Sequence, residues 1–278
     1  MIVRLFCPKC AIETNKKMQG RLDIEVPVPV SQLADDGRYE VRCGIGHEST
    51  VILDNIKFEL LFEMGLNAIF DGYPREAVSS FASSLERFYE FYWRVAMRHT
   101  GVPATELDQA WKPMSKMSER QLGAFITAST VLTGSKPRLL NPNRQVPFRN
   151  SVIHNGYVPT KEEAIEFGNT VMELIFEGLD QLRELDSSSL METYQLMSPR
   201  DYDGDENSED SDELVGCVNI LTAIDVRHPP KGDDQRVGDV CAQIKRIGYE
   251  RQPMRMQLLT DQEMYEHSPD RVRGQGDE

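Results

Sequence analysis

The sequence predicts a mainly α-helical protein, with a helical bundle preceded by a small β-rich module and followed by a small α/β segment. Hydrophobic residues recur with a helical period from about residue 55 to residue 186. Before residue 54 they alternate with polar residues, as in strands, and cysteine and histidine pairs flank the alternating stretches. A chain of 278 residues is long enough for about two domains.

Composition narrows the class of protein. Hydrophobic residues make up 40% and charged residues 27% of the chain, which is ordinary for a soluble globular protein. The opening MIVRLF leads directly into CPKC, unlike a signal peptide, and Glu59 and Glu63 interrupt the most apolar helix. We therefore expect a cytoplasmic protein with no membrane-spanning segment.

The net charge of −14 lies mainly in the last third of the chain, because residues 187–278 hold 20 of the 45 acidic side chains and 10 of the 31 basic ones. Residues 1–186 are close to balanced and leave room for a local basic groove. Nothing in the charge distribution indicates broad, non-specific affinity for nucleic acid.

The first 56 residues have the pattern of a zinc ribbon. Cys7 and Cys10 form one knuckle, CPKC, and Cys43 with His47 forms a second, CGIGH. Alternating residues between and after the knuckles predict strands at residues 21–30, 38–42 and 50–53. Cysteines in a cytosolic chain are more often metal ligands or packing residues than disulfides. Three thiolates and one imidazole complete a tetrahedral zinc site of the structural kind.

The alternative is that these four residues are unconnected buried side chains. Ribbons more often have cysteine in the last position, so His47 leaves the ligand set open at that point. A module of about fifty residues is too small to fold on a hydrophobic core alone, so we expect the metal to supply much of its stability. The module is either architectural or recognises nucleic acid or a partner.

Residues 57–186 are predicted to form the helical bundle. The first helix runs from about residue 55 to Asp71, with apolar residues on one face. Pro74 opens a second helix that ends before Gly101 and whose aromatic stripe we assign to packing. A third covers residues 118–132, with Ser118 as its cap. The residues expected on the apolar face of the first helix are Phe58, Leu61, Phe62, Leu66, Ile69 and Phe70.

Residues 134–147 have three prolines and no period, which predicts a loop. Lys136, Arg138 and Arg144 make this loop basic, so it is either a substrate-binding loop or a solvated connector. A short helix, RNSVIHN, follows and ends at Gly156. Thr160 and Glu163 then form a capping box for a last helix that extends to about residue 185.

The short helix carries the chemistry of metal-free RNA cleavage. A guanidinium such as that of Arg149 binds phosphate through two donors and stays charged. An imidazole such as that of His154 titrates near neutrality and can transfer a proton. Asn150 and His154 are four residues apart and share one helix face, and Arg149 is long enough to reach the same region.

The hexapeptide RNSVIH in this helical context resembles the RxxxxH motif of the HEPN superfamily, in the form with a polar residue after the arginine. The order of elements over residues 57–186 is similar to that family's. The resemblance implies a dimerising bundle of four or five helices and a metal-independent endoribonuclease. Carried over, Arg149 would be the catalytic phosphate-binding residue, His154 the acid/base and Asn150 the polar second position. Many members have an acidic residue on the long helix, where Glu86 lies here, although a solvated glutamate is the simpler interpretation.

The mechanism implied is attack by the RNA 2′-hydroxyl. One histidine cannot be acid and base at once, so two copies across a two-fold axis would form the site, and we expect a homodimer. The resemblance further implies a role in phage defence or a toxin system, with an antitoxin or regulatory protein as partner. Two alternatives remain: a non-catalytic binding or sensing HEPN domain, and a zinc-ribbon adaptor with a bundle used only for dimerisation.

The C-terminal part is predicted as an acidic linker at residues 187–213, a small α/β segment at 214–267 and a disordered tail at 268–278. Within the α/β segment, LVGCVNILTAIDV and MRMQLL have strand character and VGDVCAQIKRIGY helix character. Cys217, His228 and Cys241 lack knuckle spacing and receive no metal.

Overall fold

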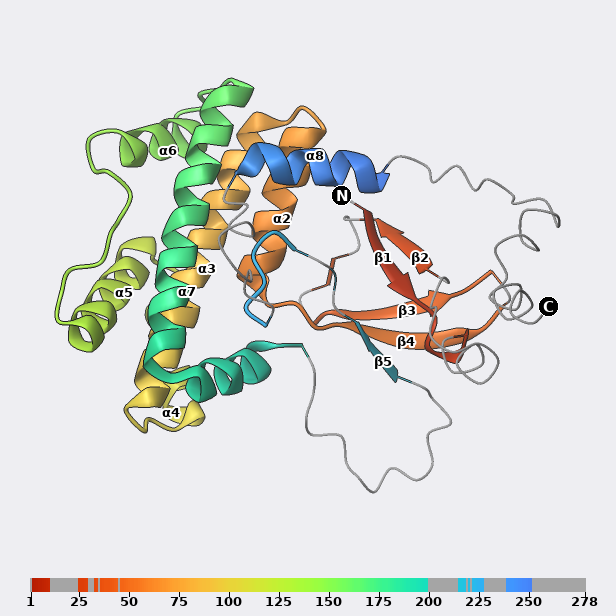
Figure 1. Cartoon of the computed structure of the whole chain (residues 1–278), viewed down its shortest axis with the longest axis horizontal. Coiled ribbons are helices and arrows are strands. Elements are labelled where there is room, and N and C mark those ends of the chain that lie inside the picture. Colours follow the sequence, from red (N-terminus) through yellow and green to blue (C-terminus); the bar gives the residue numbers. More distant parts are fainter. Residues whose placement is uncertain are drawn as a thin grey trace, which may run out of the picture.

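The computed structural model describes residues 2–10, 25–29, 33–34, 36–44, 46–199, 215–218, 220, 222–227 and 239–251. Over these ranges the protein is mostly helical, with a helical bundle beside two small sheets (Figure 1). Among the described helices, none has the length and apolar character needed to cross a membrane.

The two sheets contain five strands. β1 (Ile2–Phe6) pairs antiparallel with β2 (Glu25–Pro29). β3 (Arg38–Arg42) pairs antiparallel with β4 (Glu48–Leu53), whose other edge pairs in parallel with β5 (Val215–Val218). The predicted strand at 38–42 is confirmed, β4 begins two residues before the prediction, and β1 was not predicted.

Alternating residues of β3 and a continuously buried run in β4 build a small core at this sheet. Tyr39 and Val41 point to the buried side of β3, and exposed residues lie between them. Among the described residues, this core has five buried side chains: Leu5, Tyr39, Val41, Val51 and Leu53.

The bundle is arranged around α3 (Pro74–His99), which contacts every helix of the bundle that precedes α8. Phe81 of α3 lies between two glycines, because a Cβ atom on Gly65 or Gly168 would come within 2.4 or 2.7 Å of its ring. The aromatic stripe of α3 is therefore packing, as predicted. The other helices are α2 (Lys57–Phe70), α4 (Ala104–Trp111), α5 (Ser118–Thr133), α6 (Gln145–His154), α7 (Lys161–Met197) and α8 (Val240–Arg251).

Several helix ends differ from the sequence-based expectation. α4 was not predicted, because only Leu107 and Trp111 of its eight residues are buried and its apolar pattern is weak. The assignment of Ser118 as a cap is wrong: Ser118 is the first helical residue, and Met117 occupies the cap position without a side-chain bond. α6 begins at Gln145, since a proline such as Pro147 is tolerated in a first helical turn.

The capping box of Thr160 and Glu163 is confirmed at the start of α7. A kink at Asp186, with φ −163° and ψ 92°, interrupts the helix where its end was predicted. The linker beginning at residue 187 is wrong for residues 187–197, which form a further helical stretch. Asp186 caps this stretch by accepting bonds from the backbone of Ser188 and Ser189, so the polar serines mark a helix start.

The described residues of the C-terminal segment pack on the sheet and the helices that precede them, and not on one another as a separate α/β unit. β5 extends the β3–β4 sheet, and α8 packs on α2 and α7 (Figure 1). Ile224, Val226, Val240, Ile244 and Ile247 belong to the core of the bundle. The stretch MRMQLL, the tail at 268–278 and residues 200–213 of the predicted linker lie outside the described residues.

Two buried carboxylates of α2 hold this C-terminal segment. Glu59 is fully buried and accepts hydrogen bonds from the backbone of Val226 (2.8 Å) and from the side chain of Asn55 (3.2 Å). Glu63 accepts from the backbone of Ala223 (3.0 Å) and pairs with Arg246. Burial raises the pKa of Glu59 to about 7, against the lowering effect of the Val226 bond.

The pKa of Glu59 predicts a pH-dependent stability. Because its folded-state pKa is raised, its contribution to stability is full below the unfolded pKa of about 4.5 and is lost as pH rises through about 7. Glu59→Gln keeps an oxygen for the Val226 N–H but cannot ionise. From pH 5 to pH 8 the wild-type free energy of unfolding should fall, relative to the variant, by on the order of 3 kcal/mol. Urea unfolding at each pH measures this, and parallel curves would contradict it.

Candidate metal centre and the Arg149–His154 helix

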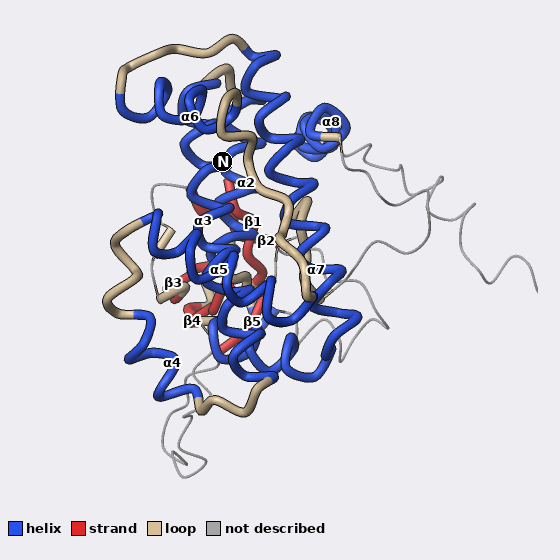
Figure 2. Tube along the Cα trace, turned by 90° about the vertical axis from the view of Figure 1, so that its left-hand side faces the viewer, coloured by secondary structure: helices blue, strands red, loops and turns tan. Residues whose placement is uncertain are grey.

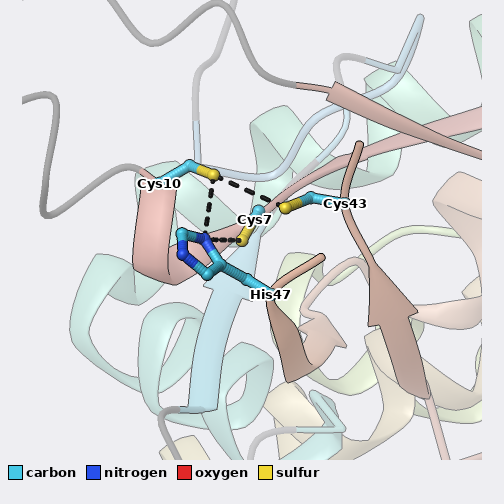
Figure 3. A group of neighbouring side chains, drawn as sticks. All are labelled: Cys7, Cys10, Cys43 and His47. Atoms are coloured by element: carbon cyan, nitrogen blue, oxygen red, sulfur yellow. Dashed lines mark hydrogen bonds between the residues drawn. The ribbon is translucent and has the colours of Figure 1, made fainter. Parts of the chain in front are cut away.

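The predicted knuckles converge on one point (Figure 3). Cys7 directly follows β1, and Cys10 lies on the helical turn after it. Cys43 directly follows β3 and His47 directly precedes β4. The connection between them is closed by a 3.0 Å bond from the Cys43 N–H to the His47 carbonyl, and Gly46 adopts φ +91°, which glycine favours.

The spacing of the four donor atoms fits a tetrahedral metal site. All four lie within 4.8 Å of one another. The Cys10 sulfur is 3.6 Å from that of Cys43 and 3.3 Å from His47 Nδ1, and the Cys7 sulfur is 3.9 Å from the same nitrogen. Tetrahedral zinc bonds would separate two sulfurs by about 3.8 Å and a sulfur from a nitrogen by about 3.6 Å. The cluster can therefore bind a metal and is compatible with structural zinc.

The three thiols of the cluster are buried together. The three cysteines are at most 5% exposed, while His47 is half-buried. Burial raises the pKa of the Cys10 thiol to about 12, and the neighbouring thiols add to this effect. A bound cation would favour the thiolate instead. With four protein donors no position is left for water, so the arrangement suits a structural role.

The second candidate site is α6, which lies at the end of the bundle away from α4 (Figures 1 and 2). Arg149 is half-buried and donates to Glu86 of α3 at 2.5 Å and to the side-chain oxygen of Asn150 at 3.1 Å. Fully buried Val152 anchors α6 in the bundle core. The guanidinium is thus held in one orientation by two acceptors.

His154 is the last residue of α6 and is exposed. In the part of the chain that the structure describes, its ring makes no hydrogen bond or ion pair. Asn150 lies one turn earlier on the same helix. The imidazole is therefore open to solvent and to a second molecule, whereas the guanidinium five residues before it is fixed.

Glu86 is the residue that the sequence underestimated. The simpler interpretation of a solvated glutamate is wrong, because its side chain is 26% exposed and paired with Arg149. Tyr89, one turn later on α3, is buried close to both charges. Burial is the largest effect and raises the pKa of Tyr89; the charge of Glu86 raises this pKa further, and that of Arg149 lowers it. The one sequence signal for the pairing of Glu86 with Arg149 was the resemblance, because many members of the similar family have an acidic residue on the long helix.

The basic loop is largely neutralised by α7. Arg138 pairs with Glu173 at 2.6 Å, and Arg144 pairs with Glu166. Lys136 is exposed and has no ion pair within the described residues. The loop leads directly into α6, but two of its three basic side chains are already paired with carboxylates of α7.

No protein-family model, curated protein or solved structure matches this chain.

The metal centre predicts one bound ion per chain. Purified protein analysed by elemental analysis should contain about one equivalent of a divalent metal, and Cys43→Ser should lose most of it because one of the four donors is weakened. Cys217→Ser is the matched control, since Cys217 is exposed and outside the cluster. Equal metal content in the two variants would contradict the site.

Proposed function

We propose that this chain is a metal-independent endoribonuclease of the HEPN type. The proposal rests on one observation about α6: its Arg149 side chain is held in place and its His154 side chain is exposed. The guanidinium is fixed by Glu86, and the imidazole is exposed at the end of the same short helix. A fixed phosphate-binding group and a free proton-transfer group on one short helix supply half of what RNA cleavage requires.

In the proposed reaction a neutral His154 removes the proton of a ribose 2′-hydroxyl. The 2′-oxygen attacks the adjacent phosphorus, and the 5′-oxygen leaves with a proton from a second, protonated histidine. Arg149 donates hydrogen bonds to the phosphate oxygens as negative charge grows on them. The products are a 2′,3′-cyclic phosphate and a 5′-hydroxyl end.

The acid and the base come from two copies of the chain. Each copy supplies one histidine on α6, and His154 is exposed rather than facing the bundle. A two-fold axis at this face would bring two α6 helices together and place one histidine on each side of the scissile phosphate. The homodimer is thus part of the proposed site.

Glu86 is a positioning residue in this scheme. A guanidinium has five N–H donors, and the bonds to Glu86 and Asn150 use only some of them, so donors remain for a phosphate. The carboxylate also limits the rotamers of a long side chain, which lowers the entropy lost when substrate binds.

We further propose that the ion of the Cys7–Cys10–Cys43–His47 cluster is zinc, in a structural role. The mix of thiolate and imidazole donors and the tetrahedral spacing favour this ion. The ribbon then serves as a scaffold or as a surface for RNA or a regulatory partner, and RNA cleavage itself requires no metal. By resemblance, the setting would be phage defence or a toxin system.

A binding or sensing role without cleavage is the second candidate. The paired cations favour it, because Arg138, Arg144 and Arg149 each face a carboxylate and the surface around α6 is not strongly positive. In that case Arg149 and His154 would contact a ligand or partner without chemistry. Analysis of cut ends in total RNA separates the two roles.

His154→Ala should lower the rate of RNA cleavage by at least about a hundredfold, since a positioned acid/base contributes that much. Asn155→Ala, the exposed neighbour, is the control and should cut normally. Cleavage should persist in EDTA at a concentration that leaves the ribbon metal bound. Unchanged cleavage by His154→Ala, or loss of cleavage in EDTA by a folded protein, would contradict the mechanism.

A further inference from the structure

One C-terminal segment links the two hydrophobic cores of the protein. We call it the strap, meaning the described residues among 215–227. Its strand β5 pairs with β4, and Ile220 packs against the small core of the β3–β4 sheet. Ile224 and Val226, a few residues later, are buried in the core of the helical bundle. The strap is therefore shared by the ribbon and the bundle.

The start of α2 and the residues just before it bind the main chain of the strap. Three polar side chains four residues apart in the sequence bind its backbone groups: Asn55, which precedes α2, and Glu59 and Glu63, which lie within it. All three are buried, so losing these bonds would leave their polar atoms uncompensated or open them to water. The N–H bonds run from Ile220 to Asn55 (2.9 Å), from Ala223 to Glu63 (3.0 Å) and from Val226 to Glu59 (2.8 Å).

The strand that β5 pairs with begins at the metal cluster. His47 directly precedes β4, and Cys43 ends the neighbouring strand β3. The pairing of β4 with β5 runs from Thr50 with Val215 to Leu53 with Val218. Cys43 and His47 lie at the two ends of the β3–β4 turn, so an ion bound by both would fix the start of β4 relative to β3.

We propose that a metal ion at Cys7, Cys10, Cys43 and His47 controls the docking of the strap on α2. Without the ion the β3–β4 turn opens, β5 loses its partner strand, and Ile220 loses the core it packs against. The strap then leaves α2 and uncovers Asn55, Glu59 and Glu63. This inference rests on metal binding by the cluster and adds to it a metal-dependent switch.

The uncovered face has the chemistry of an extended-peptide site. It offers a row of acceptors for main-chain N–H groups and the positions vacated by two apolar side chains two residues apart, those of Ile224 and Val226. In the metal-bound protein the strap occupies this face. When the metal is lost from the cluster, the face on the bundle becomes open to another extended segment.

Release should be confined to the strap. The bundle has a large core of its own, built mainly from α2, α3 and α7. α8 has separate anchors: the Val240 N–H donates to Asn169 of α7 at 2.9 Å, and Arg246 pairs with Glu63. Loss of the ribbon therefore removes one set of strap contacts and leaves the helices packed.

Hydrogen–deuterium exchange of the full chain, with and without metal, tests this switch. Metal is removed with a strong chelator, and the metal content of each sample is measured. We expect the amides of the strap to exchange at least tenfold faster without metal, while those of α3 and the first half of α7 are unchanged. Asn55→Ala should speed exchange of the strap with metal still bound, and Cys217→Ser, which does not alter the cluster, should keep both metal and metal dependence.

Three results would overturn the proposal. Strap amides that stay protected after the metal has left, while β3 and β4 lose protection, would show that the two are not coupled. Faster exchange throughout α3 would show global unfolding instead of release. A chain that takes up no metal would overturn the metal centre, and with it the switch.

Discussion

The burial of α3 is the constraint on which the other elements depend. Twelve of its 26 residues are buried, over more of its surface than the single stripe of a surface helix. α2 and α7 can approach it closely because glycines at 65, 168 and 178 leave room for the rings of Phe81 and Phe88. With α3 fixed between them, Tyr89 stacks on Phe125 of α5 and Glu86 accepts a hydrogen bond from Arg149 of α6. The position of Arg149 is thus a consequence of how a helix far away in sequence packs.

Polar groups inside the fold join its parts. Hydrophobic contacts alone would let the ribbon and bundle meet in several ways, because apolar packing has little directionality. Asn55, Glu59 and Glu63 remove this freedom, since each buried acceptor must meet a particular N–H. The cost is a carboxylate at position 59 whose charged form is disfavoured by burial. The C-terminal segment is in this way tied to residues 160 to 167 positions earlier in the chain.

Most of the helices and the residues of the Cys7–Cys10–Cys43–His47 cluster were accessible from sequence because their signals are local. The period of α2, the capping box of α7 and the knuckles at Cys7 and Cys43 all depend on residues within a few positions of one another. What the sequence missed depends on distant contacts. β1 pairs with residues 19 to 27 positions away (Phe6 with Glu25, Ile2 with Pro29), and the docking of β5 and the pairing of Glu86 with Arg149 leave no periodic trace. The short helix α4 likewise depends on tertiary contacts, since Leu107 and Trp111 are its only buried residues.

The carboxylates around α6 determine what this face can recognise. A phosphate approaching Arg149 meets Glu86, and one approaching Arg138 or Arg144 meets Glu173 or Glu166. Each cation has already lost part of its hydration to its partner, so a phosphate gains less from it than from a free cation. Together with a net charge of −14, this disfavours binding by charge alone. If RNA is the substrate, its selection must rest on base contacts or on the geometry of the two facing α6 helices, and unspecific cleavage would be suppressed by the same arrangement that holds Arg149 in place.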